Sequence, residues 1–522
     1  MKRGNIIIKG AFLLAAFSFA GCQKSYLEKG NKNELSGESF WKTADQAVQG
    51  ITATYAALHS ATGDKWTWFE QTYISATYKT DEIINNKTQN YGIALHGYTY
   101  TSDESTMTNL WAMCYAGINR ANQCIEGIAG IPSAAQNAQN GLTDSLRKSL
   151  IGEAKFLRAH FYFTLINYFQ HLPLILTVPK TNADYYPADA PEAAVWSQIV
   201  ADLTEAKGSL PAARPSAELG RVTSYTAQAY LGKAWLFQEN FQQASVEFAN
   251  VIANPALGLM DNFADNFNGQ QENNKESLFE IQFSADRSNG NDERTPLAWE
   301  VSSSALDGWE LFYPSPWLVT ELQKDLQTGG GYSDRVYGTM FFDDPASSAP
   351  IVDKPGVIVN YSDVKSQLDY PVFFKKYTYP SDLADNGNYT GINVNLMRFA
   401  DVLLMQAEAL NELNQTPQAL ILVNQVRTRS HAAPLSAMSQ DQLRTQIRHH
   451  ERPCELSMEY CIRWPDLYRW SRGKVAPEPI KNTLIAHQQE FAGNFITGKH
   501  EIYPVPLSEM SKNPNIHQAP NW

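Results

Sequence analysis

The 522-residue sequence is poor in cysteine, and its five cysteines are not spaced for a metal or redox site. No Cys-X-X-Cys pair occurs, which excludes the usual zinc and dithiol motifs. Cys454 and Cys461 would lie about 10.5 Å apart along a continuous helix, beyond the roughly 7 Å between Cα atoms that a disulfide allows. Cys114 and Cys124 fail the same test. We expect these four to be small core residues, and we expect no metal and no cofactor.

Charge is also scarce. Charged residues make up 18% of the chain, and the acidic excess gives a formal net charge of −12. This balance argues against a nucleic-acid partner and against a polybasic membrane surface. Outside the N-terminus no run of 18 apolar residues occurs, so the sequence predicts no transmembrane helix.

Catalytic motifs are missing as well. The sequence has no Gly-X-Ser-X-Gly, no P-loop, no His-Glu-X-X-His and no Gly-X-Gly-X-X-Gly after a strand. Arg448-His-His-Glu451 is a poor metal motif, because adjacent histidines on a helix point about 100° apart. The pairs Asp81-Glu82 and Asp343-Asp344 face different ways and would not flank one glycosidic bond. We therefore expect no enzyme activity.

The N-terminus is a targeting segment. Lys2-Arg3 and Lys9 precede the apolar residues 11–19, and Ala20-Gly21 then leads to Cys22. This order predicts a secretory signal over residues 1–21. The Ala-Gly-Cys ending resembles a bacterial lipobox, which implies lipidation of Cys22 and a polar tether over residues 22–38. The alternative is an ordinary cleaved signal with a chance cysteine.

Apolar periodicity predicts a mainly α-helical body over residues 39–522. Leu150–Pro173 has apolar residues three or four apart and becomes apolar on nearly all sides after Phe161, which predicts a central helix wrapped by others. Further helices are expected over residues 39–60, with Thr43 as N-cap, 102–130, 192–210 and 440–472. The final segment, residues 500–522, reads as extended.

Two helical hairpins, residues 221–255 and 396–430, resemble tetratricopeptide repeats. In the first, small residues would let two helices approach while aromatic residues fill the space beside them. The residues at the repeat spacing are Leu231, Gly232, Trp235, Ala244 and Phe248. The scaffold would therefore span residues 39–255 and 396–472, and 256–395 would be a long irregular insertion with one strand at 278–283.

Aromatic residues are the strongest functional candidates. They gather in two irregular segments, Thr62–Tyr100 and Thr295–Trp317, where binding residues commonly lie on a rigid scaffold. Flat rings can stack on the C–H faces of sugars, although many of these rings would also serve as core. The candidate ligand contacts are Trp66, Trp68, Tyr73, Trp299, Trp309 and Trp317.

Several motifs follow one another along the chain: Phe40-Trp-Lys-Thr43, Gly152-Glu-Ala-Lys-Phe-Leu-Arg-Ala159, Arg398-Phe-Ala-Asp-Val-Leu-Leu-Met405, Glu451-Arg452 with Glu455-Leu456 and Glu459, and Tyr503-Pro-Val-Pro506. In this order they resemble the SusD/RagB family of outer-membrane nutrient-binding lipoproteins from Bacteroidetes. Three residues separate Glu459 from Arg463, one more than is usual in the family, which predicts a kink or π-bulge there. These Glu and Arg residues look structural, forming ion pairs with neighbouring helices.

The resemblance implies a non-catalytic lid at the cell surface. Such a protein captures an oligosaccharide and delivers it to a SusC-like TonB-dependent transporter, while its lipid anchor holds it on the outer membrane facing the exterior. Three alternatives remain open: a lid for a non-glycan nutrient such as peptide or host glycoprotein, a glycoside hydrolase, and a purely structural tetratricopeptide adaptor.

Overall fold

The computed structural model describes residues 40–59, 73, 76–86, 88, 92–286, 288, 293–306, 308–344, 351–354, 357–378 and 389–522. The predicted signal, Cys22, Trp66 and Trp68 lie outside these residues. None of the helices in the described ranges combines the length and apolar character that a membrane crossing needs.

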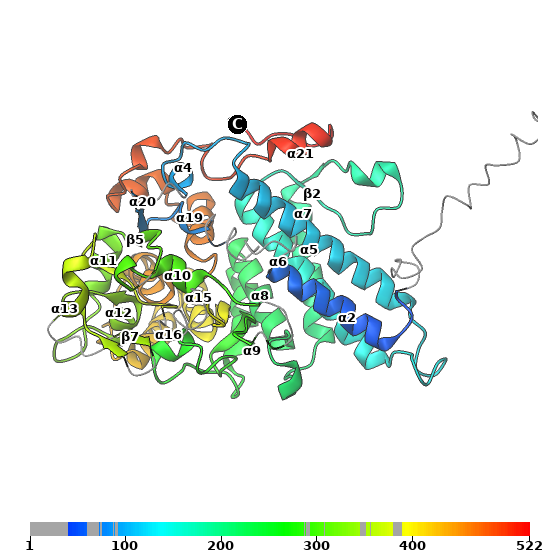
Figure 1. The fold of residues 1–522 in the computed structure, drawn as a ribbon, viewed down its shortest axis with the longest axis horizontal. Helices are drawn as coiled ribbons and strands as arrows, with labels where there is room; N and C mark the ends of the chain where they lie inside the picture. The colour runs from blue at the N-terminus through cyan, green and yellow to red at the C-terminus, as the bar shows by residue number, and fades with distance from the viewer. Residues whose placement is uncertain are drawn as a thin grey trace, which may run out of the picture.

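The N-terminal half is a layer of long helices lying side by side (Figure 1). They are α2 (Ala44–Tyr55), α5 (Ser105–Gly130), α6 (Asp144–Tyr168) and α7 (Glu192–Ser209). Glycines bring them close, since Gly117 lies against the ring of Phe161, and Gly50 and Gly127 lie against Trp41. The N-cap predicted for the first helix is confirmed, because the Thr43 side chain accepts a hydrogen bond from the Gln46 amide.

Helix α6 is the predicted central helix, with shifted ends. Every residue from Phe156 to Tyr168 is buried, which confirms that other elements wrap its second half. It begins at Asp144, capped by Thr143, and ends at Tyr168 rather than at the proline. Leu172–Pro173 instead forms β2, which pairs with β3 (Asp189–Ala190). A cap signal seven residues before the apolar run therefore sets the start, and the prediction missed it.

Both helical hairpins are present. The first consists of α8 (Ser224–Phe237) and α9 (Phe241–Ile252), and the second of α15 (Phe399–Glu412) and α16 (Thr416–Arg429). Gly232 lies so close to Phe248 that an added Cβ would come within 2.6 Å of the ring. Helices α9 and α15 pack together, so the hairpins adjoin in space although the insertion separates them in sequence.

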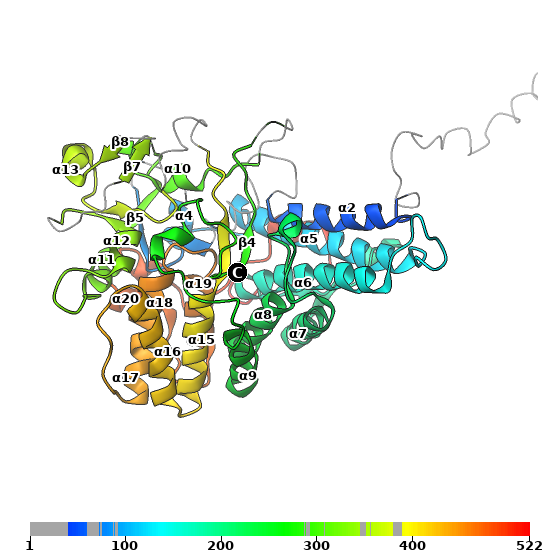
Figure 2. The same ribbon diagram turned by 90° about the horizontal axis from the view of Figure 1, so that it is seen from below.

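The insertion is less irregular than predicted, because it contains several short antiparallel strand pairs (Figure 2). The predicted strand is β4 (Ser277–Ile281), and its partner β10 (Val394–Arg398) occupies the start of what was predicted as helix. The other strands are β1 (Ile83–Asn85) with β5 (Phe312–Pro314), β6 (Met340–Phe341) with β9 (Phe373–Phe374), and β7 (Ile351–Lys354) with β8 (Val357–Val359). The short helices here are α10 (Leu297–Val301), α11 (Pro316–Gln323), α12 (Asp334–Thr339) and α13 (Tyr361–Val364).

The long helix predicted over residues 440–472 is wrong. The segment is divided into α17 (Gln440–Gln446), a π-helical turn (Ile447–Glu451), α18 (Arg452–Leu456) and α19 (Arg463–Arg472). Pro453 and Pro465 cannot donate the backbone hydrogen bonds of a continuous helix. Met458 and Cys461 have positive φ, so the chain leaves the helix between Glu455 and Arg463, where a kink was predicted. Cys454 and Cys461 remain free, although the continuous helix assumed for them does not exist.

The remaining elements are short. They are helices α4 (Ile93–His96), α20 (Ile480–Ala486) and α21 (Leu507–Lys512), and the 3₁₀ turns η2 (Ala56–Leu58), η3 (Asn182–Tyr185), η4 (Ser216–Glu218), η5 (Phe263–Asn266), η6 (Ser304–Leu306), η7 (Lys365–Gln367) and η9 (Ala492–Asn494). The residues after His500 dock on α6, where the Tyr503 amide donates to the Tyr168 carbonyl at 2.6 Å.

A buried ionic cluster joins the insertion to the second hairpin and α18. Arg398 is fully buried and donates to Glu276, Glu455 and Glu459, and Lys376 donates to Glu459 at 3.0 Å. Burial alone would raise the pKa of Glu455, but the neighbouring arginines hold this pKa at about 2. The structural role predicted for the Glu and Arg residues of this segment is therefore confirmed.

Candidate functional site

Two indole rings form an exposed platform on the insertion. Trp299 and Trp309 stack with their ring centroids 4.1 Å apart and their planes 22° from parallel. Trp309 is 38% exposed, and Trp299 is the one residue of α10 that is not buried. Tyr389 extends the platform, because its ring lies 6.4 Å from Trp299 at an angle of 29°. The three rings are thus nearly parallel. Trp299 and Trp309 cover one face of each other, so the surface they offer is the exposed part of Trp309 and the smaller exposed part of Trp299.

Main-chain hydrogen bonds hold the two tryptophans together. The Trp309 amide donates to the Trp299 carbonyl at 2.6 Å, and the Leu311 amide donates to the Glu300 carbonyl at 3.0 Å. Gly308 directly precedes Trp309, and a Cβ atom on it would collide with the Ser302 carbonyl oxygen. Close approach of two backbones requires glycine at this point. The platform therefore rests on a support that does not depend on its side chains.

The N-terminal irregular segment packs against the main chain that supports the platform. Strand β1 pairs with β5, the strand that follows the platform, with Ile84 opposite Tyr313. The Asn86 side-chain amide donates to the Glu310 carbonyl at 2.8 Å, and the Glu310 carboxylate accepts from Ser303 and Ser304. The two aromatic-rich segments that the sequence singled out are thus joined.

A charged side chain lies at the edge of the platform. The Arg294 guanidinium lies 5.3 Å from the centroid of the Tyr389 ring, a distance typical of cation–π contacts. An isolated bridge between Thr295 and Thr390 holds the two flanking segments in register. The platform therefore combines apolar faces with a hydrogen-bond donor at one end.

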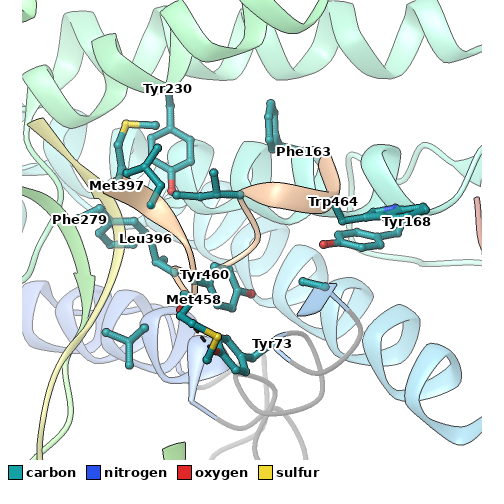
Figure 3. Close-up of a cluster of buried hydrophobic side chains, with 14 of the residues drawn as sticks. Tyr73, Phe163, Tyr168, Tyr230, Phe279, Leu396, Met397, Met458, Tyr460 and Trp464 are labelled. Carbon is teal, nitrogen blue, oxygen red and sulfur yellow. Dashed lines mark hydrogen bonds between the residues drawn. The ribbon is translucent and has the colours of Figure 1, made fainter. Parts of the chain in front are cut away.

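The other predicted aromatic contacts lie elsewhere. Tyr73 is 1% exposed, and its hydroxyl donates to the Met458 carbonyl at 3.2 Å. Figure 3 shows it within the core, beside Met458 and Tyr460. This burial argues against its predicted role in stacking on a ligand. Trp66 and Trp68 lie outside the described residues.

Trp317 is only partly available. Its ring stacks on His487 at 3.8 Å with an angle of 8°, so His487 covers one face. The Arg463 guanidinium also lies 5.1 Å from it. Trp317 is therefore packed into the junction between α11 and α20, apart from the stacked pair.

The sequence prediction missed Tyr389 and Arg294. Tyr389 stands in an Asn- and Gly-rich stretch, the composition of an exposed loop, and that was the available signal. Its contact with Trp299 depends on the pairing of segments that are about ninety residues apart, and no local pattern reveals that pairing.

The acidic and histidine motifs have structural partners. Asp81 forms ion pairs with Arg463 and His487. Burial alone would raise the pKa of Asp81, but the Arg463 guanidinium holds this pKa well below its usual range. Burial raises the pKa of its neighbour Glu82 to about 8. His449 pairs with Glu478, and His450 lies beside Glu321 and Asp325. Within the described residues no three His, Cys, Asp or Glu side chains are grouped as metal ligands.

Comparison with known proteins places the chain among SusD-like proteins. The SusD family model (SusD_RagB) matches residues 275–522, and a second model, described as starch-binding and associating with the outer membrane, matches residues 25–236. SusD-like protein P2 of Formosa agariphila is 28% identical, over 97% of this chain and 98% of its own length. SusD-like protein P25 of the same organism is 24% identical over 99% and 98%.

Solved structures share the fold. A SusD superfamily protein from Bacteroides vulgatus matches with a TM-score of 0.78 at 23% identity, covering 92% of this chain and all of that one. A laminarin-binding SusD-like protein matches at 0.71 and 23% identity, over 92% of this chain and all of its own. Surface glycan-binding protein A from Bacteroides uniformis matches at 0.74 and 20% identity, over 91% and 99%. At these identities the likeness shows the fold.

Proposed function

Because the chain belongs to the SusD/RagB family and has the mainly helical SusD-like fold, we propose that it binds a glycan at the cell surface on the Trp299–Trp309 platform. SusD-family proteins are non-catalytic binding proteins. The proposal is therefore a capture function, in which the ligand is held and released without bond cleavage.

The observation that carries the proposal is the nearly parallel stack of Trp299, Trp309 and Tyr389, in which Trp309 is exposed and the other two rings are half-buried. Large apolar rings left on a surface mark an interaction site. A pyranose ring presents an apolar C–H face that a flat indole matches, and the rigid indole loses little conformational entropy on binding. Ring hydroxyls that point sideways would then reach polar groups at the platform edge.

The proposal also covers location and partner. Lipidation at Cys22 would tether the body to the outer membrane, facing the exterior, and a SusC-like TonB-dependent transporter would receive the captured oligosaccharide. The second family model, described as associating with the outer membrane, supports the location. The transporter is inferred from the family.

The first prediction concerns affinity. Lipid-free protein is titrated by calorimetry with starch, laminarin and galacturonan. Trp309→Ala and Trp299→Ala should each weaken binding of the recognised glycan by roughly tenfold or more, since stacking of an aromatic ring is worth about 1–3 kcal/mol. Tyr185→Ala serves as the matched control, because Tyr185 is a 63% exposed aromatic on the separate loop between β2 and β3.

Other outcomes separate the alternatives. Binding of peptides but of no glycan would replace the proposal with a lid for non-glycan nutrients. Release of shorter sugars by pure protein would indicate a hydrolase. Unchanged affinity in both tryptophan variants would remove the platform from the ligand site while leaving glycan binding itself intact.

A further inference from the structure

A cavity opens at the end of α2. Its volume is 670 Å³, within the roughly 300–1,000 Å³ typical of small-molecule sites. Tyr55 and His59 line it from the end of α2, Leu219 and Arg221 from the loop before α8, and Gln282 and Glu293 from the segments after β4.

One short segment of the main chain links this cavity to the platform. Glu293 pairs with Ser284 in an isolated bridge and lines the cavity. The next residue, Arg294, places its guanidinium over Tyr389, which in turn lies beside Trp299. Figure 2 shows α2 and α10 along the same side of the molecule. Two consecutive residues, Glu293 and Arg294, therefore belong to the cavity wall and to the edge of the platform.

The walls of the cavity suit a sugar. The His59 ring packs on Phe283 with centroids 4.7 Å apart, and Leu219 is 55% exposed, so flat and apolar surface is present. The Glu293 side chain is exposed and can accept hydrogen bonds from hydroxyl groups. Apolar walls with a few polar groups that fix orientation are the usual make-up of a ligand pocket.

The charges of the cavity favour a neutral sugar. Glu218, Glu280 and Glu293 line it, and its basic side chains are Arg221 and His59, whose pKa burial lowers. Arg221 is already engaged, because it donates twice to Glu153 at 2.8 Å. Glu218 is paired with Arg214 and Arg221, and Glu280 accepts hydrogen bonds from the Asn273 amide and the Asn393 side chain. The exposed Glu293 carboxylate is therefore the acidic group that a ligand meets. It would repel a uronate or sulfate, whereas neutral hydroxyls would donate to it.

We propose that a glycan held on the platform continues past Tyr389 and Arg294 into this cavity, so that the protein selects an extended, neutral oligosaccharide over short or acidic ones. The proposal rests on the proposed function. Two contacts on one chain bind more tightly than either alone, because the second contact forms at a high effective concentration. A disaccharide that covers only the platform gains nothing from the cavity.

The test compares ligand lengths. Calorimetry is performed on the lipid-free protein with oligosaccharides of two to eight sugars cut from starch, laminarin and galacturonan. His59→Ala and Glu293→Gln should leave the affinity for di- and trisaccharides unchanged and weaken the affinity for hexa- to octasaccharides by about tenfold. Asp261→Asn is the matched control, since the Asp261 carboxylate is fully exposed outside the cavity. Circular dichroism checks that each variant folds.

The outcomes are distinguishable. Equal losses at every length, or no loss at any length while Trp309→Ala still weakens binding, would overturn this inference and leave the proposed function standing. Tighter binding of galacturonan oligosaccharides than of the neutral series would also overturn it. Failure of the wild-type protein to bind any glycan would overturn both.

Discussion

At the scale of single residues, Lys79 is the most unusual side chain in the core. It is fully buried, and its ammonium group has no hydrogen-bond partner among the described residues. The Nζ atom lies 3.9 Å from the ring centroid of Trp464 and 4.2 Å from that of Tyr503. These rings offset part of the cost of removing the charge from water. Burial still lowers the pKa of Lys79 well below its usual value.

Lys79 therefore predicts a pH dependence of stability. The folded-state pKa is lower than the unfolded value of about 10.4, so the unfolded chain binds the proton more tightly and folding weakens as pH falls through this window. Relative to Lys79→Met, the wild-type free energy of unfolding should rise as pH increases from 7 toward 10. Urea denaturation of both proteins at several pH values measures this difference. A constant difference across the range would contradict the prediction.

At the scale of elements, close packing at glycine decides how segments approach. Gly308 allows the platform strand to lie against the Ser302 carbonyl, and Gly232 allows α8 to lie against Phe248. Gly208, near the end of α7, has no atom within 4 Å of the position of an added Cβ. The same residue type thus has a packing role at two sites and none at the third.

This contrast gives a paired prediction. Gly308→Ala should displace Trp309 and lower glycan affinity toward that of Trp309→Ala, while far-ultraviolet circular dichroism stays native. Gly208→Ala should leave affinity unchanged and stabilise the protein by about 0.5–1 kcal/mol. The reason is that alanine lowers the conformational entropy of the unfolded chain relative to glycine. Thermal melts measure the change in stability, and calorimetry measures the change in glycan affinity. Full affinity in Gly308→Ala would show that the platform does not depend on this contact.

The elements also show which features sequence reasoning reached. The long helices carry their apolar period locally, so α2, α5, α7 and both hairpins were predicted within a few residues. Trp299 and Trp309 were identified from composition, but their mutual stacking depends on hydrogen bonds between segments ten residues apart. Tyr73 looked like its neighbours, because burial against Met458 comes from a segment 385 residues away. The break before α19 was predicted only as a kink or π-bulge within one long helix, because Pro453 and Pro465 were not taken into account.

At the scale of the whole molecule, one continuous apolar core runs from Ala57 to Ile516 and includes residues of both halves of the chain. The first described residues lie beside the start of α2, at the opposite end of the long axis from α11 and α13 (Figure 1). An N-terminal anchor would therefore attach far from the strands and short helices of the insertion.

The anchor gives the last prediction. Cys22→Ser should move the protein from the membrane fraction to the soluble fraction after expression in a lipoprotein-processing bacterium, because two acyl chains or more supply stable anchoring. Glycan affinity of the released protein should equal that of the tethered body. Immunoblots of separated fractions measure the first effect and calorimetry the second. Retention of Cys22→Ser in the membrane fraction would argue for a different attachment.

The main-chain support of Trp299 and Trp309 has an evolutionary consequence. The hydrogen bonds that join these residues use amide and carbonyl groups, which every residue except proline supplies. Under the proposed function, replacement of the two side chains would alter the recognised ligand without loosening the main chain beneath. Solved structures that share 18–23% of their residues with this chain keep the fold, and a main-chain support of this kind allows the side chains above it to differ while the fold stays constant.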